Sequence, residues 1–282
     1  MEDHNKRLRF RELLKGSDGI IAPSAPDPMF ARLVEDCGYR LFHLAGNGMH
    51  RSRVLPDCSM VTMTEMAERA NSIAEVLSIP MLVDGETGYG GPLQTGRAVR
   101  AFERAGVAGI RFEDSVFGQN GIFAERPTVT VAEMVDKIKA MVDARTDAAM
   151  ILAVRCDARA AESREQVLER IDAYVSAGID AIGVHPSDAE EHRWFGANVA
   201  VPLMNPWPRA GINTMAEFFA LGYRVALVTS SVSMAALAAA RTMLLELKNT
   251  GGQDDYFTGV TDFAEVRDWY RDLGFRATKR FK

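Results

Sequence analysis

The sequence predicts an α/β fold, a (β/α)8 barrel of the TIM type, and three observations lead to this prediction. Eight apolar runs of strand length recur along the 282 residues, helical patterns separate them, and no linker rich in proline, glycine or serine divides the chain. Strands that alternate with helices are typically parallel and joined by right-handed crossovers. An open doubly wound sheet is the alternative, but the strand count and a length near the roughly 250 residues of a typical barrel favour the barrel.

The predicted strands are continuous apolar runs, as expected for parallel strands that are buried on both faces. They are 19–23, 39–46, 79–85, 107–114, 149–157, 180–186, 199–205 and 223–229. Where apolar residues recur with a period near 3.6, helices are predicted at 62–77, 92–106, 131–145 and 163–178. Three helical stretches end in glycine directly before the next strand, at Gly106, Gly178 and Gly222, which is typical of helix C-terminal caps.

The last part of the chain continues with helical patterns. Segment 233–249 is small and apolar on more than one face, which fits a helix on its own barrel as well as a helix packed against a partner subunit. Residues 258–275 are typical of an amphipathic terminal helix. We therefore predict a single barrel domain over residues 1–282 with a C-terminal helical extension at about 258–275.

Composition and charge argue against several classes of protein. The net charge of −5 gives no electrostatic reason to expect nucleic acid or an anionic membrane as a partner. No apolar run approaches the roughly 20 residues of a membrane span, and the charged N-terminus is unlike a secretory signal. Cys37, Cys58 and Cys156 lie far apart without zinc-site spacing, which is typical of reduced thiols. We expect a cytoplasmic enzyme or binding domain.

Acidic residues gather where the predicted strands end, which is the end of a barrel where active sites are built. Asp84 and Glu86 follow the third strand, Glu113 ends the fourth, and Asp57 lies in the long segment after the second. Clustered carboxylates repel one another unless a cation joins them, and Mg²⁺ prefers oxygen ligands of this kind. Each acid alone also fits a turn, a cap or a local ion pair. The combination predicts a metal site.

A cation and a histidine follow at the next two strand ends. Arg155 suits a substrate carboxylate through a bidentate fork, although it would equally neutralise Asp157. His185 ends the sixth strand, where a lone histidine is often structural. Together with the acids, these residues predict a metal site for a small anionic acid.

Four motifs in order resemble the isocitrate lyase/phosphoenolpyruvate mutase superfamily over roughly residues 10–245. They are LPDCSMVTMTEM from residue 55, LVDGETGYGG from residue 82, AVRAFERAGVAGIRFED from residue 98 and AVRCDA from residue 153. The resemblance implies a Mg²⁺-dependent barrel, with Mn²⁺ as an alternative. It also implies a homotetramer, a dimer of dimers in which the eighth helix swaps between subunits. The implied substrates are small 2-oxo or 2-hydroxy acids, whose C–C or C–P bond breaks through an enolate on the metal.

The resemblance also implies roles for individual residues. Gly46 and Asn47 match the loop whose amides hold the substrate carboxylate, and Arg155 matches the arginine that binds a substrate carboxylate. Glu86 stands where an aspartate is usual, so its carboxylate reaches one methylene further. The implied metal ligands are Asp57, Asp84, Glu86 and Glu113.

Segment 113–128 resembles the gate loop that decides the chemistry in this superfamily. It lacks the cysteine, lysine and histidine of lyases that cleave 2-methylisocitrate-like substrates, which argues against a cysteine-dependent mechanism. In the mutase and phosphonopyruvate hydrolase branch, Asn120 would match the loop asparagine and His185 would contact the far end of the substrate. Ser115 and Gln119 replace the lysines of that branch. Beyond the loop, the side chain of Trp207 offers an apolar wall for a substrate substituent.

We therefore predict a Mg²⁺-dependent lyase that cleaves a C–C bond of a small 2-oxo or 2-hydroxy dicarboxylic acid by retro-aldol cleavage or decarboxylation. Two alternatives stay open: a C–P bond enzyme, and a catalytically silent barrel that binds a metabolite. The catalytic candidates are Arg155, His185 and Asn120. The substrate-binding candidates are Gly46, Asn47, Arg155, His185 and Trp207.

Overall fold

The structure is a computed structural model that describes residues 2–119, 127–207, 212–259 and 263–279. The chain divides into two compact units, Met1–Ser233 and Met234–Lys282. The strands are β1 (Ile20–Pro23), β2 (Phe42–Leu44), β3 (Met81–Asp84), β4 (Gly109–Glu113), β5 (Ile151–Cys156), β6 (Ala181–Val184), β7 (Leu203–Pro206) and β8 (Tyr223–Val228). The helices are α1 (Glu2–Lys15), α2 (Pro28–Asp36), α3 (Gly46–Ser52), α4 (Met63–Ala74), α5 (Pro92–Arg104), α6 (Val131–Ala144), η1 (Ala158–Ala160), α7 (Arg164–Ala177), α8 (Ala189–Asn198), α9 (Met215–Ala220), α10 (Ser231–Thr250), α11 (Asp254–Gly259) and α12 (Phe263–Lys279).

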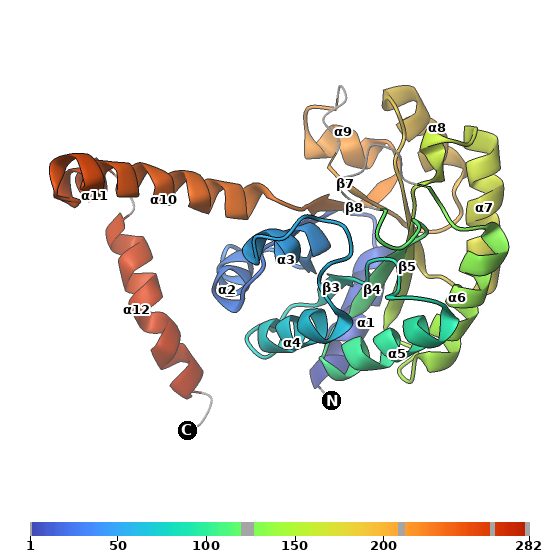
Figure 1. The fold of residues 1–282 in the computed structure, drawn as a ribbon, viewed down its shortest axis with the longest axis horizontal. Coiled ribbons are helices and arrows are strands. Elements are labelled where there is room, and N and C mark those ends of the chain that lie inside the picture. The colour runs from blue at the N-terminus through green and yellow to red at the C-terminus, as the bar shows by residue number, and fades with distance from the viewer. Residues whose placement is uncertain (1, 120–126, 208–211, 260–262, 280–282) are drawn as a thin grey trace. The chain divides into compact units, whose positions relative to one another are not determined.

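The first unit is the predicted (β/α)8 barrel. Its eight strands are all parallel, and each from β2 to β7 pairs with the next strand in the chain, while β8 also pairs with β1. A parallel bridge between Ser24 and His43 joins the remaining two edges, so the sheet comes close to closing on itself. Figure 1 looks along this barrel and shows helices α2 to α9 in a ring around the strands.

The predicted elements are confirmed in order, although every strand is shorter than predicted, and β2 and β7 illustrate why. The strand predicted at 39–46 is β2, which ends at Leu44 because α3 begins at Gly46. The strand predicted at 199–205 is β7, which begins only at Leu203 because α8 extends to Asn198. The glycine caps are confirmed: Gly178 follows α7 with a φ of 114°, a left-handed conformation that favours glycine.

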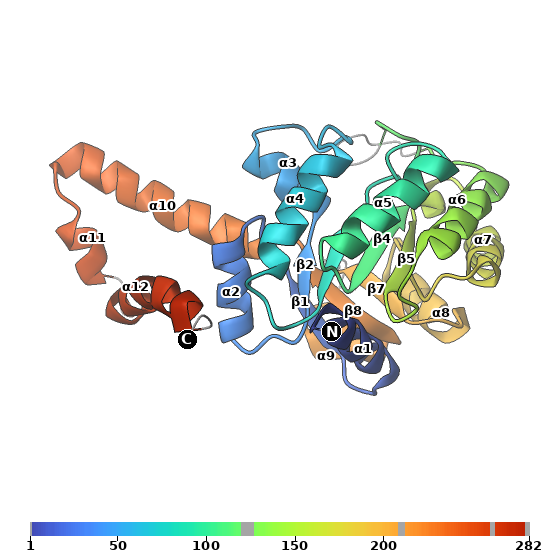
Figure 2. The ribbon, with the colours of Figure 1, turned by 90° about the horizontal axis from the view of Figure 1, so that it is seen from below.

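Helix α1 closes the N-terminal end of the barrel, and the sequence did not predict it. Phe10 and Leu14 are buried against the apolar residues that fill the barrel interior, among them Ile151 and Met204. Lys6 and Arg7 of the same helix are also buried, and they donate to the carbonyls of Ala74 at the end of α4 and Val107 before β4. Figure 2 shows α1 from below, in front of the strands.

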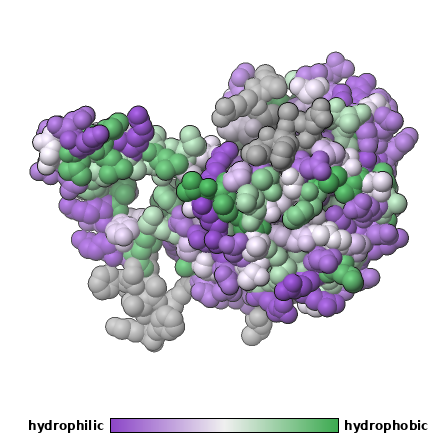
Figure 3. Space-filling view, viewed as in Figure 1, coloured by the Kyte–Doolittle hydropathy of each residue, from purple (hydrophilic) through white to green (hydrophobic). Residues whose placement is uncertain are grey.

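The second unit is helical. α10 covers the predicted helix 233–249, and α12 takes the place of the predicted terminal helix but begins at Phe263. No residue of α10 is buried, and Figure 3 shows hydrophobic residues along it. Its large exposed apolar side chains are Met234, Leu237, Leu244, Leu245 and Leu247. Among the described helices, none is both long enough and apolar enough to cross a membrane.

Candidate active site

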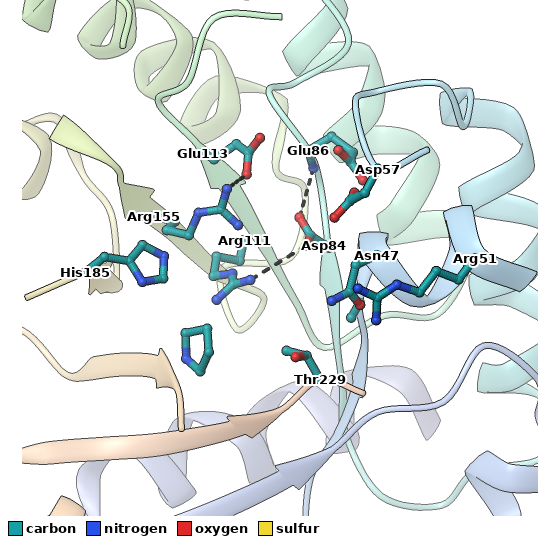
Figure 4. Close-up of a pocket in the computed structure, with 12 residues that line it drawn as sticks. Asn47, Arg51, Asp57, Asp84, Glu86, Arg111, Glu113, Arg155, His185 and Thr229 are labelled. Atoms are coloured by element: carbon teal, nitrogen blue, oxygen red, sulfur yellow. Dashed lines mark hydrogen bonds and ion pairs between the residues drawn. The ribbon is translucent and has the colours of Figure 1, made fainter. Parts of the chain in front are cut away.

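A cavity of about 300 Å³ lies at the carboxyl ends of the barrel strands (Figure 4). Side chains from β3, β4, β5 and β7, from the residues that directly follow β6 and β8, and from the segments after β2 and β3 converge on it. The charged residues that line it are Asp57, Asp84, Glu86, Glu113, Arg51, Arg111 and Arg155. The remaining lining residues are Ala45, Asn47, His185, Pro206 and Thr229. The convergence of acids predicted from the strand ends is therefore present.

Asp84 and Glu86 meet the start of α3 on one side of this pocket. Asp84 Oδ2 accepts a hydrogen bond from the Gly46 amide at 3.3 Å, and Oδ1 accepts one from the Glu86 amide at 3.1 Å. A Cβ at position 46 would overlap the Glu86 carboxylate and lie 3.3 Å from Asp84 Oδ2, so a larger residue there would displace the Glu86 carboxylate. Burial alone would raise the pKa of Asp84, but the charges of Arg111 and Arg155 outweigh it and hold that pKa low.

Asp57 reaches the same place from the loop between α3 and α4. Ligand atoms of Asp57, Glu86 and His50 all lie within 4.8 Å of one another. Burial raises the pKa of the Asp57 carboxyl, and the nearby charge of Asp84 raises it further. A cation held between these carboxylates would relieve the repulsion between them.

His50 organises this group, and both of its ring nitrogens are taken up by hydrogen bonds to the backbone. Its Nε2 accepts hydrogen bonds from the amides of Met60 and Val61 at 3.0 and 3.1 Å. In the neutral ring the hydrogen is therefore on Nδ1, which donates to the Gly46 carbonyl at 2.8 Å. Because both nitrogens are engaged, a cation here would be held by oxygen atoms. Such a donor set fits a hard divalent metal.

Arg155 lies at the centre of an ion-pair network. Its Nε donates to both oxygens of Asp157 at 3.0 Å, and its Nη2 donates to Oδ2 at 2.8 Å. The same Nη2 forms an ion pair with Glu113. Asp157 also accepts from the hydroxyl of Ser115 at 2.7 Å and lies 3.4 Å from His185 Nε2. Arg155 therefore neutralises Asp157 and also lines the pocket, so the ion-pair role does not exclude the predicted contact with a substrate carboxylate.

The mouth of the pocket is polar. Asn47 and Arg51, both on α3, donate to the hydroxyl of Ser230 at 3.5 and 3.1 Å. Trp207 lies in a neighbouring cavity that shares Pro206 and Thr229 with the acidic pocket. The predicted loop asparagine, Asn120, lies outside the described residues.

Comparisons with known proteins agree with this geometry. The sequence pattern of the family described as Phosphoenolpyruvate phosphomutase matches residues 10–248. The chain is 34% identical to 2-methylisocitrate lyase of Aeropyrum pernix over 271 residues, which are 94% of this chain and 86% of the relative. It is 34% identical to 2,3-dimethylmalate lyase of Eubacterium barkeri over 276 residues, which are 95% and 94% of the two chains.

The chain belongs to the phosphoenolpyruvate mutase/isocitrate lyase superfamily. Among solved structures, a phosphonopyruvate hydrolase complex with oxalate and Mg²⁺ superposes with a TM-score of 0.86 at 26% identity, covering 98% of both chains. The resemblance drawn from the four sequence motifs is therefore confirmed.

Within this superfamily fold, sequence reasoning missed two buried pocket residues, Arg111 and His50. Arg111 alternates with Glu113 along β4, so the period of two along a strand was a signal that both point into the barrel. His50 lies in a stretch with no predicted element, and only the formation of α3 brings it beneath the acids.

Proposed function

We propose that this protein is a Mg²⁺-dependent lyase that cleaves a C–C bond of a small 2-oxo or 2-hydroxy dicarboxylic acid. The observation that carries the proposal is the pocket, where four carboxylates and three arginines surround a cavity of about 300 Å³. A cavity of this size suits a small acid. Two relatives named as lyases of 2-methylisocitrate and 2,3-dimethylmalate support the same class of reaction.

Four carboxylates would hold the Mg²⁺, with Mn²⁺ as an alternative: Asp57, Asp84, Glu86 and Glu113. When bound, the cation supplies a Lewis acid that stabilises the negative charge developing on a substrate oxygen. His50 keeps the loop that carries Asp57 in place through the amides of Met60 and Val61. The Gly46 amide fixes the Asp84 carboxylate, and the missing side chain at Gly46 leaves room for Glu86.

The other pocket residues bind and orient the substrate. Arg155 presents a guanidinium whose plane is fixed by Asp157, which suits a carboxylate. Asn47 adds an amide at the mouth, and His185 at the rim binds the far end of the acid. The negative charge of the acid complements the positive charge of the arginines in the pocket. Each charge-assisted hydrogen bond between them adds specificity.

A product assay with purified protein tests this proposal. Oxaloacetate, 2-methylisocitrate, 2,3-dimethylmalate and phosphonopyruvate are supplied in separate reactions with Mg²⁺, and pyruvate and phosphate are measured. We expect pyruvate without phosphate from at least one carbon acid, abolished by EDTA and by Asp84→Asn. The matched control is Asp136→Asn, because Asp136 is an exposed acid on α6. No product and no Mg²⁺ binding would favour the metabolite-binding alternative.

C–P bond cleavage is the second candidate function. The similarity to the phosphonopyruvate hydrolase structure favours it, as does the histidine at the end of β6. The hydroxyl of Ser115 is bonded to Asp157 rather than offering a cation at the gate, so the site has less positive charge for a dianionic phosphonate. Release of phosphate together with pyruvate from phosphonopyruvate would establish this reaction in place of the first.

We further propose a cytoplasmic homo-oligomer, a dimer of dimers in which the eighth helix swaps between subunits. The exposed leucines of α10 support it, because a run of apolar side chains on one helix is typical of a protein–protein contact. Sedimentation equilibrium should give four chains per particle. Leu244→Glu should lower that number, whereas the same change at an exposed polar position, Asn249→Glu, should not. A monomeric wild-type protein would contradict this proposal.

A further inference from the structure

Arg111 is a buried cation of the pocket to which the proposed mechanism gives no role. It lies on β4 directly opposite Asp84 of β3, and it faces the same side of the strand as Glu113. Only 2% of the residue is exposed, yet it lines the cavity (Figure 4). Among the described residues, its Nη1 atom is buried without any hydrogen-bond partner.

The two buried arginines of the pocket differ in how much of their charge is already neutralised. Arg155 is bound by two carboxylates, Asp157 through three hydrogen bonds and Glu113 through an ion pair. Within the described ranges of the chain, the one carboxylate that forms an ion pair with Arg111 is Asp84, whose Oδ2 lies 3.6 Å from Nη2, while Asp157 adds only a more distant charge. That separation exceeds the usual 2.7–2.9 Å of a charge-assisted hydrogen bond. Arg111 therefore has the weaker compensation of the two.

The other neighbours of Arg111 do not neutralise its positive charge. Asp84 already accepts the Gly46 and Glu86 amides, which fix its orientation toward α3. His43 on β2 is fully buried, and burial followed by the charge of Arg111 lowers its pKa to about 3, so it stays neutral. A buried donor without a partner is unfavourable, and a buried guanidinium without close compensation is more so. Such a group is typical of a site that a ligand completes.

We propose that the guanidinium of Arg111 binds a carboxylate of the substrate inside the pocket and thereby selects dicarboxylic over monocarboxylic acids. A planar guanidinium presents donors in a fork that matches a carboxylate, and the cavity reaches this side chain directly. Arg155 lies close enough for its charge to act on Arg111, so one anion between them would relieve their repulsion. The inference rests on the proposed function and names the substrate class that this site accepts.

Binding calorimetry with a matched ligand pair tests the inference. Malate and lactate are both 2-hydroxy acids and differ by one carboxylate, so the ratio of their affinities reports on the second carboxylate. The ratio is measured for wild type, Arg111→Met and Arg111→Lys. Arg53→Met is the charge-matched control, because Arg53 pairs with Glu65 and does not line the cavity.

We expect Arg111→Met to reduce the preference for malate by about 10- to 100-fold, the range of a lost charge-assisted hydrogen bond. Arg111→Lys keeps the charge but loses the fork, so it should fall between Arg111→Met and wild type. Arg53→Met should leave the ratio unchanged. If Arg111→Met does not fold, an unchanged ratio in Arg111→Lys overturns the inference. A loss of preference in Arg51→Met, with none in Arg111→Met, would also overturn it by placing the second carboxylate at the mouth.

The same experiment separates this inference from the proposed lyase function. Each titration is repeated in MgCl₂ and in EDTA. If Mg²⁺ does not bind and pyruvate is not formed, the proposed function fails, whereas the dependence of the malate-to-lactate ratio on Arg111 is still measured in EDTA. If Mg²⁺ binds and pyruvate is formed, but the malate-to-lactate affinity ratio is the same in the Arg111 variants as in wild type, only the inference fails.

Discussion

The two ends of the barrel both carry buried charged side chains, but these differ in how completely they are hydrogen-bonded within the chain. At the N-terminal end, Arg7 donates to the carbonyls of Val107 and Glu103 at 3.1 and 2.7 Å and to Asp147 at 3.0 Å. At the carboxyl end, one buried nitrogen of Arg111 has no partner among the described residues, and several acids face one another. A buried charged side chain that is hydrogen-bonded within the chain contributes to the stability of the fold. A buried charged side chain without close partners is typical of a ligand-binding site.

Backbone strain follows the same division. In the part of the chain that the structure describes, the non-glycine residues with positive φ are Val54, Ser59, Glu86 and Tyr89. All four follow β2 or β3 at the carboxyl end, in the two loops that carry Asp57, Glu86 and their neighbours. Such conformations cost on the order of 1–3 kcal/mol each and persist where the surroundings enforce them. The stable end of the barrel therefore supports a strained, charged end, which is typical of barrel enzymes.

The largest expected effect is at the carboxyl end. Asp57→Asn removes one acid of the proposed metal site, so turnover should fall by about 10³-fold, as expected when several kcal/mol of metal-dependent stabilisation are lost. The metal-free protein should unfold at the same temperature or higher, because the charge of Asp57 is opposed by burial and by Asp84. Steady-state kinetics and calorimetric melting in EDTA measure both. A strongly destabilised Asp57→Asn would contradict the view that the charged residues at the carboxyl end serve the site rather than the stability of the fold.

The second prediction concerns the N-terminal end, where a substitution should lower stability without lowering turnover. Arg7→Met leaves two carbonyls and Asp147 without their donor, so the free energy of unfolding should fall by about 3 kcal/mol. Turnover per folded molecule and Mg²⁺ affinity should not change. Urea unfolding measures the first, and the pyruvate assay below the melting range measures the second. Arg9→Met is the matched control, because Arg9 is an exposed arginine of the same helix.

The sequence was informative where a pattern is repeated along the chain. All eight strands are found in the predicted order, because buried parallel strands are continuous apolar runs. Helix α1 was missed because its buried positions include Lys6 and Arg7, which are held by hydrogen bonds to carbonyls far along the chain rather than by an apolar face. No local pattern records such partners.

The site divides along the same line. Asp84, Glu86 and Glu113 converge as predicted, because the carboxyl ends of neighbouring parallel strands meet at one rim. The role of His50 depends on α3 and on amides ten and eleven residues further along, so it becomes visible only in the folded chain. The surplus charge of Arg111 likewise follows from distances to Asp84 that spacing along the sequence does not give.

The third prediction tests the strain at the carboxyl end. Val54 has a φ of 57° and is 93% exposed, so its side chain contributes little packing while its backbone is strained. Val54→Asn should stabilise the protein by about 1 kcal/mol, because asparagine tolerates the left-handed conformation. Val54→Ala, which does not, should gain less than half as much. Equal effects in urea unfolding would show that the left-handed backbone at this loop stores no strain.

The smallest expected effect is a pH dependence at the N-terminal end. Burial alone would raise the pKa of Asp147, but hydrogen bonds from His4, the Ala149 amide and Arg7 outweigh it and lower that pKa to about 2. A carboxyl whose pKa is lower in the folded state contributes stability above its unfolded value of 3.8, and this stability is lost as the pH falls toward 2. Between pH 5 and pH 3, wild type should therefore lose about 0.5 kcal/mol more than Asp147→Asn, after allowance for solvent screening. Urea unfolding at the two pH values measures the difference, with Asp136→Asn as the exposed control. A larger acid loss in Asp147→Asn than in wild type would contradict the assignment of this end as the one where charges are satisfied within the fold.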